Sequence, residues 1–187
     1  MTEGENVHNK YGRKFYGKYR GTVVNNVDPE RRGRLQVSVT DFSSLIPMAT
    51  WALPCFPWAG PQMGTYLIPP IGAGVWVEFE QGDPDYPVWV GCWWGSTPEV
   101  PATASGLTTP GSPVAVTQSI TQGALVIADA PVPPMQAPGV MVNSGPTSFI
   151  TVDAGGITIT APTITLKAAS VNITGVTDIN AGALKVT

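Results

Sequence analysis

The C-terminal part of the sequence repeats every seven positions, and within each repeat the aliphatic residues fall two apart. Read from Ile150, it runs ITVDAGG, ITITAPT, ITLKAAS, VNITGVT, DINAGAL and KVT. A coiled coil also repeats every seven residues, but its apolar positions fall three and four apart. A spacing of two is that of a β-strand, in which alternate side chains share one face. Each heptad therefore predicts a short strand followed by a turn, stacked on the next as in a β-solenoid.

One chain cannot bury the aliphatic pairs of this repeat. At about 3.3 Å per residue, a heptad covers one face of a prism, so a three-sided turn needs about three heptads. The sequence has four clear heptads and a fifth that matches the pattern poorly, which together complete fewer than two turns of such a prism. Three chains winding together, each supplying one face per layer, solve this problem, and we therefore predict an obligate homotrimer. Eight residues of each chain would form its core: Ile150, Val152, Ile157, Ile159, Ile164, Leu166, Val171 and Ile173.

The rest of the chain also predicts strands. Its 19 Pro and 21 Gly residues interrupt every window long enough for an amphipathic helix. Five segments have strand patterns: 19–24, 35–40, 51–56, 75–80 and 87–92. Five short strands in this space suit a small closed barrel, which leaves no exposed sheet edge. We expect an all-β chain with an arm (1–17), a barrel (18–98), a Pro/Thr/Gly-rich connecting segment in which short strands could form (99–146) and a β-helical spike (147–187).

Charge and composition exclude several classes of protein. Only 12% of the residues are charged, and eight of the ten basic residues lie within 10–34. No run of about 18 apolar residues predicts a membrane-spanning helix. The first residues lack the apolar region of a secretory signal, so we expect synthesis in the cytoplasm. The single histidine, His8, and two cysteines, which we expect to be buried free thiols, predict no metal site, cofactor or catalytic residue.

Short motifs in the barrel region resemble those of one family. They are Gly21-x-Val23, Asp28-Pro29, Gly33-Arg34-Leu35, Gly74-x-x-Val77-x-Phe79, Gly82-Asp83-Pro84 and Pro87-Val88-x-Val90-Gly91. In this order, and followed by a repeating β tail, they resemble phage baseplate assembly protein V and the OB-fold base of VgrG-type spikes of contractile injection systems.

The resemblance implies a five-stranded OB-fold barrel that trimerises on the tail hub, followed by an intertwined three-chain β-helix. It implies a structural, non-enzymatic central spike that pierces the target envelope when the sheath contracts, as part of a virion tail baseplate or an injection particle. Expected partners are further copies of the chain, tube, hub and baseplate proteins, and a PAAR-type tip protein over the C-terminal strand ends. Four arginines are the candidates for hub contact: Arg20, Arg31, Arg32 and Arg34.

The sequence departs from fuller members of the family. Between barrel and spike there is no lysozyme-like domain, since 99–146 contains only Glu99 and Asp129 as carboxylates. Glycoside hydrolysis would need a facing pair. The tail also lacks the His-x-His iron site at which some short spikes end.

Two other classes remain open. One is an OB-fold nucleic-acid-binding module with a multimerising β-solenoid tail, in which Trp89, Trp93 and Trp94 form a base-stacking platform. Against it, the chain beyond residue 34 is acidic, and the tryptophans also suit a trimer contact. The other is a β-solenoid with surface activity, such as glycan cleavage or ice binding.

Overall fold

Almost all of the regular structure is β-strand. The computed structural model describes residues 14–40, 50–105, 109 and 111–175. Within that part the helices are one α-helical turn, α1 (Ala102–Ser105), and the 3-10 turns Glu80–Gly82 and Thr97–Glu99. The chain divides into two units, Met1–Val100 and Pro101–Thr187. The all-β prediction is confirmed, whereas most of the predicted arm, with His8, and the end of the tail lie outside the described residues.

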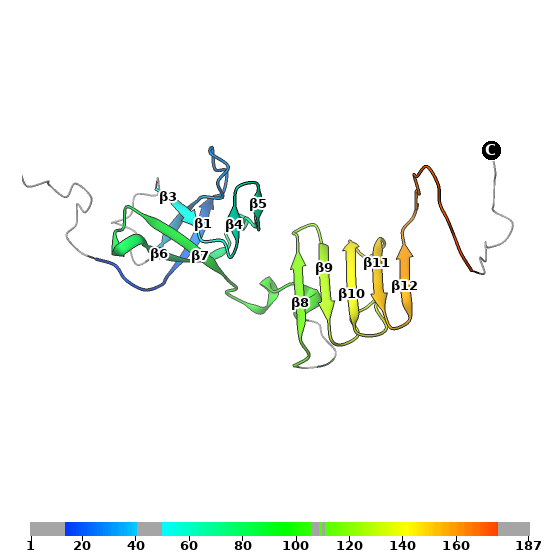
Figure 1. Ribbon diagram of the computed structural model, residues 1–187. Coiled ribbons are helices and arrows are strands. Elements are labelled where there is room, and N and C mark those ends of the chain that lie inside the picture. Colours follow the sequence, from blue (N-terminus) through cyan, green and yellow to red (C-terminus); the bar gives the residue numbers. More distant parts are fainter. Residues whose placement is uncertain (1–13, 41–49, 106–108, 110, 176–187) are drawn as a thin grey trace, which may run out of the picture. The chain divides into compact units, whose positions relative to one another are not determined.

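Five strands of the first unit close into a barrel (Figure 1). Their order around it is β1-β2-β3-β7-β6, and all neighbours are antiparallel except β3 and β7. The strands are β1 (Tyr19–Asn25), β2 (Leu35–Val39), β3 (Trp51–Pro54), β6 (Gly74–Phe79) and β7 (Pro87–Trp93). They fall on the five segments predicted from alternation, so the closed five-stranded barrel is confirmed.

Alternate side chains of these strands fill the barrel. The buried residues are Val23, Leu35, Val37, Val39, Ala52, Val75, Val77, Phe79 and Trp89, together with Phe15. Phe15 belongs to the segment predicted as an arm, yet its side chain is buried and its N–H donates to the Gly82 carbonyl at 2.8 Å. The barrel thus includes residues before 18.

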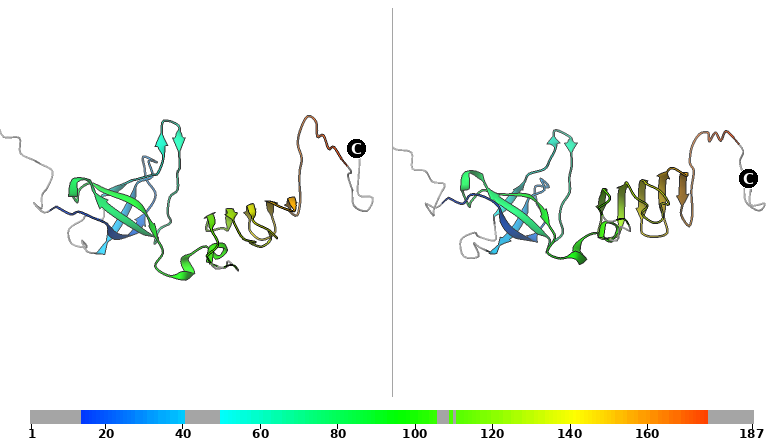
Figure 2. Two further views of the ribbon diagram at one scale, coloured as in Figure 1. Left: turned by 60° about the horizontal axis from the view of Figure 1, so that its bottom comes forward. Right: turned by 90° about the horizontal axis from the view of Figure 1, so that it is seen from below.

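A small hairpin that the sequence did not predict interrupts the barrel between β3 and β6. It consists of β4 (Ala59–Gly60) and β5 (Met63–Gly64), and it projects away from the barrel strands (Figure 2). Its four strand residues are all exposed.

The second unit contains a five-stranded antiparallel sheet in which the strands follow chain order (Figure 1). The strands are β8 (Val114–Gln118), β9 (Gly123–Ala128), β10 (Gly139–Ser144), β11 (Phe149–Asp153) and β12 (Gly156–Thr160). The sheet therefore begins inside the segment predicted to connect barrel and spike, and the boundary expected at 146/147 lies within it.

The heptads have two different structures in this single chain. Those that begin at Ile150 and Ile157 form the neighbouring strands β11 and β12. Those that begin at Ile164 and Val171 contain no strand in their described residues, 164–175. As far as residue 175, the single chain thus forms an antiparallel meander and no complete solenoid turn, because a strand needs a hydrogen-bonded neighbour that residues 164–175 do not find within the described part of the chain.

The loop between β1 and β2 is organised by the carboxylate of Asp28. Its Oδ1 accepts from Arg34 Nε (3.0 Å) and Nη2 (2.7 Å) and from the Glu30 N–H (3.0 Å). Its Oδ2 accepts the backbone N–H groups of Arg32 (2.7 Å) and Arg34 (3.2 Å). The Arg34 guanidinium first, and then these backbone donors, hold the pKa of Asp28 far below its ordinary value, because each bond favours the ionised form.

This lowered pKa predicts an acid-sensitive barrel. A carboxylate with a depressed pKa stabilises the fold above its unfolded-state pKa, about 3.9, and that contribution is lost as the pH falls through the folded-state pKa. We expect Asp28→Asn to lower the urea midpoint of barrel unfolding at pH 7, and the difference from the wild type to shrink steadily below about pH 4.

Glu30→Gln is the matched control, because the Glu30 side chain is half exposed and its ion pairs should contribute less than about 1 kcal/mol. A difference between wild type and Asp28→Asn that stays constant from neutral to acid pH would contradict the role assigned to Asp28.

Candidate self-association interface

One face of the second sheet carries two rows of aliphatic side chains. In the first row, Val142 lies opposite Leu125 on one side and Ile150 on the other. Ile159 continues this row on β12, opposite Ile150. The second row is built in the same way, from Ile127, Val140, Val152 and Ile157. We call these eight residues the aliphatic face.

All eight side chains of the aliphatic face are exposed in the single chain. Their exposed fractions range from 37% at Val140 to 70% at Ile157. Single exposed apolar residues are common, whereas a contiguous patch on four neighbouring strands marks an interaction surface or an aggregation hazard.

The opposite face of the same sheet is covered by the chain itself. Ala124, Val126, Ala128 and Met141 are buried there, in one cluster with Val132 and Met135. The last two belong to the connection between β9 and β10, which folds back over the strands. The chain therefore supplies a cover for one face of its sheet, whereas none of its described segments covers the more aliphatic face.

The eight predicted core residues divide into two groups of four. Ile150, Val152, Ile157 and Ile159 lie on the aliphatic face. Ile164, Leu166, Val171 and Ile173 are also exposed, but they lie outside any strand. Their burial in a trimer therefore remains a prediction.

Sequence reasoning missed the other half of the aliphatic face. Leu125 and Ile127 alternate in GALVIA, and Val140 and Val142 alternate in GVMVNS. This alternation is the sequence signal that predicts the strands β9 and β10. Because it lies outside the seven-residue repeat and among prolines, these residues fall in the predicted connecting segment.

The structure does not bring the four arginines predicted for hub contact together. Arg20 lies near the start of β1, about 17 Å of strand before the loop that holds the other three. Its guanidinium stacks on Trp76 and Trp93, 5.7 and 5.1 Å from the ring centroids. Arg34 is largely buried in its bonds to Asp28.

Three of the four candidate arginines are exposed, since Arg20 keeps an exposed side chain on β1 despite its ring contacts. Arg31 and Arg32 are both exposed on the ordered loop, and Arg32 forms an exposed ion pair with Glu30 at 3.2 Å. Their contact with a hub protein remains a prediction.

The three tryptophans proposed as a stacking platform have different environments. Trp89 is buried and its Nε1 donates to the Gly33 carbonyl at 3.0 Å. Trp93 Nε1 donates to the Val75 carbonyl at 3.2 Å, whereas Trp94 is 63% exposed. Trp89 therefore serves the barrel core and is not available for stacking on a base.

The expectation of buried thiols was wrong, since Cys55 and Cys92 are both free and exposed. Cys55 follows β3, and Cys92 lies within β7, one residue before its end. Among the described residues, no group of three or more His, Cys, Asp or Glu could hold a metal ion. In that same part of the chain, no helix has the length and apolarity needed to span a membrane.

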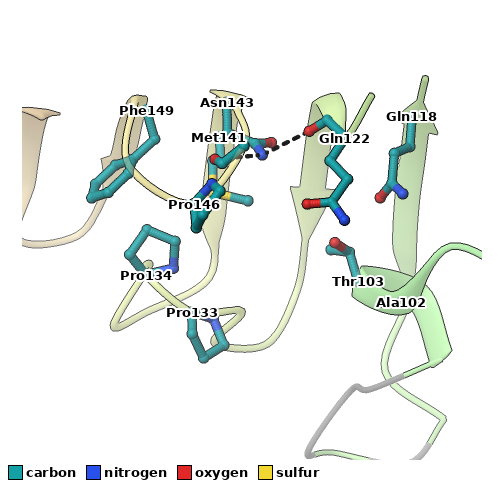
Figure 3. A pocket seen from close by; sticks show the side chains of 11 residues that line it. Ala102, Thr103, Gln118, Gln122, Pro133, Pro134, Met141, Asn143, Pro146 and Phe149 are labelled. Atoms are coloured by element: carbon teal, nitrogen blue, oxygen red, sulfur yellow. Dashed lines mark hydrogen bonds between the residues drawn. The ribbon is translucent and has the colours of Figure 1, made fainter. Parts of the chain in front are cut away.

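A shallow cavity of about 200 Å³ lies beside the covered face of the sheet (Figure 3). Its lining includes Gln118, Gln122 and Asn143 with several prolines, and none of its lining residues is ionisable. Asn143 Nδ2 donates to the carbonyls of Gln122 (3.2 Å) and Gly145 (3.3 Å). These lining side chains can donate and accept hydrogen bonds, but they provide no general acid or base.

The contrast between the two faces yields a prediction about folding. Met135 is 1% exposed against the covered face, so Met135→Ala should cost about 2–5 kcal/mol of unfolding free energy, measured by urea denaturation. Met63→Ala is the matched control, because Met63 is 53% exposed and should change stability by less than about 0.5 kcal/mol. Equal effects of the two variants would contradict the assignment of Met135 to a core.

Comparison with known proteins gives two family matches and no match to a curated protein. Residues 19–94 match the type VI secretion system/phage-baseplate injector OB domain, which coincides with the closed barrel. Residues 113–185 match the phage baseplate V C-terminal trimerisation domain, which includes the whole sheet and the aliphatic face. An injector OB domain followed by a baseplate V trimerisation domain makes this chain a baseplate-V-like protein.

Proposed function

We propose that this protein is the central spike of a contractile tail or injection machine. In this proposal three copies associate through the aliphatic face, mount on the tube or hub, and pierce the target envelope when the sheath contracts. The observation that carries the proposal is the exposed aliphatic face within the segment that matches a trimerisation domain.

Association of three copies would remove the aliphatic face from water. Each fully buried aliphatic side chain contributes about 1.5–3 kcal/mol, and each copy offers eight. The covered face cannot take this role, since its own chain already fills it. An arrangement around a threefold axis, with every aliphatic face turned inward, buries all three faces at once.

A spike also needs mechanical strength and an outer surface that slides. Side chains on the outward side of β12, Thr158 and Thr160, are small, polar and uncharged. In the proposed spike the strands lie across the long axis, so the hydrogen bonds between neighbouring strands point along that axis and the several bonds of each strand pair share an axial load.

The remaining parts of the proposal depend on the sequence resemblance. They are the contact of the exposed arginines Arg20, Arg31 and Arg32 with a hub protein, a PAAR-type tip partner, location in a virion tail or injection particle, and the absence of enzymatic activity. The nucleic-acid-binding alternative is less well supported, since Trp89 is buried in the barrel core and the Arg34 guanidinium is held by Asp28 in the β1–β2 loop.

Ile150→Asp tests the aliphatic face. The substitution would place three carboxylates close to the axis of the trimer, where burial of unpaired charge is costly. We expect the full chain to fall from trimer to monomer at micromolar concentration in multi-angle light scattering.

Thr158→Asp is the matched control, because it adds the same charge on the opposite side of the neighbouring strand. It should leave the trimer mass unchanged. An Ile150→Asp protein that remains trimeric, or an equal loss in both variants, would contradict the proposed interface.

A further inference from the structure

The shallow cavity beside the covered face of the second sheet has a polar side and an apolar side (Figure 3). Gln118, Gln122 and Thr103 lie together on the polar side. Phe149 and Pro134 lie on the other. All of the lining residues belong to the second unit, so one compact part of the chain forms the whole cavity.

The polar groups of the cavity are free to bind a ligand. The side-chain amides of Gln118 and Gln122 and the hydroxyl of Thr103 form no hydrogen bond with any other described residue. A carboxamide offers both donors and an acceptor, and a hydroxyl offers one donor and two acceptor sites. The polar side can therefore both donate to a ligand and accept from it.

Gln122 has a backbone conformation that favours glycine. Its φ is 64°, at the end of the β8–β9 turn. This conformation costs free energy in a residue with a Cβ atom, and non-glycine residues held in it cluster at sites that bind ligands. Glycine would fit the turn better, and what glutamine adds is a side chain that lines the cavity.

The turn that carries Gln122 is held in place by its neighbours. Asn143 Nδ2 donates to the carbonyls of Gln122 (3.2 Å) and Gly145 (3.3 Å), and the Gly145 N–H donates to the Gln122 carbonyl at 3.4 Å. These bonds join the β8–β9 turn to the β10–β11 turn. A group presented from a backbone that is already ordered loses less entropy when a ligand binds.

The lining selects an uncharged ligand that carries hydroxyl groups. None of the lining residues is ionisable, so a charged ligand would lose hydration without gaining an opposite charge. A sugar ring fits both sides of the cavity, because its hydroxyls match the amides and its C–H face matches an aromatic ring. The volume of about 200 Å³ is smaller than the roughly 300–1,000 Å³ of sites for drug-sized ligands, so it suits a single ring.

We infer that this cavity binds one neutral sugar ring, a hexose or N-acetylhexosamine unit of a glycan. The Gln118 and Gln122 amides and the Thr103 hydroxyl bind the ring hydroxyls, and Phe149 packs against the C–H face. The inference goes beyond the proposed function and does not depend on it, since one copy of the second unit contains the whole cavity. Association through the aliphatic face uses the opposite side of the sheet and leaves the cavity open.

Saturation-transfer difference NMR on the full chain tests this site, with glucose, galactose and N-acetylglucosamine as probes at millimolar concentration. At least one of the three should receive saturation, strongest on the C–H protons of the ring face that lies against Phe149. Glucuronate and galacturonate are the matched charged probes, and they should receive none, because the cavity offers no counter-charge.

Gln122→Gly separates sugar binding from folding. It removes one amide and relieves the positive φ, so the urea midpoint of the full chain should stay the same or rise. Loss of one hydrogen bond should raise the Kd of the bound sugar about 2- to 12-fold. Gln62→Gly is the matched control, because Gln62 has the same conformation (φ 60°) in the β4–β5 hairpin of the barrel and should leave binding unchanged.

Three results would overturn the inference. The first is the absence of saturation transfer to all three neutral sugars, and the second is equal transfer to the two uronates. The third is an unchanged Kd in Gln122→Gly, which would place the sugar elsewhere. None of these results alters the mass of the particle in solution, so a failure here is distinct from a failure of the proposed function.

Discussion

An antiparallel sheet has two faces, and the described part of this chain covers only one of them in the second unit. The β9–β10 connection places Val132 and Met135 over one side of its sheet, but no described segment covers the aliphatic face. Because eight aliphatic side chains in two continuous rows cannot stay in water without cost, the sheet depends on other copies of the chain. The proposed threefold assembly and the proposed spike role both answer that one unmet burial.

Local patterns in the sequence were sufficient for the elements that a single chain completes. In the barrel, alternation at Leu35, Val37 and Val39 predicted β2, because each of these residues is buried inside a barrel formed by neighbours in the same chain. The seven-residue repeat likewise placed Ile150 and Ile157 at the starts of aliphatic pairs on one face. Where the repeat continues past β12, residues 164–175 have no strand partner in the described part of the chain, and no local pattern indicates what covers their aliphatic side chains.

Residue counts were a poorer guide where side chains interact in pairs. The excess of basic residues in 10–34 suggested a group of arginines facing a partner. In the structure Arg34 is held by Asp28, and Arg20 stacks on Trp76 and Trp93, far along β1 from the loop. Net charge takes no account of such pairing, and it cannot separate a guanidinium that orders a loop from one that is free to bind. The number of prolines in 99–146 was a poor guide for a similar reason. It favoured a connecting segment, although the strands β9 and β10 form between the prolines.

The mass of the full-length chain in solution tests the central claim most directly. Sedimentation equilibrium over a range from high to submicromolar concentration separates an obligate trimer from weak association. We predict a particle mass of about 59 kDa, three times the 19.6 kDa of one chain, at every concentration in that range. A folded, stable particle of 19.6 kDa would contradict it, because the aliphatic face would then be stable in water without a partner.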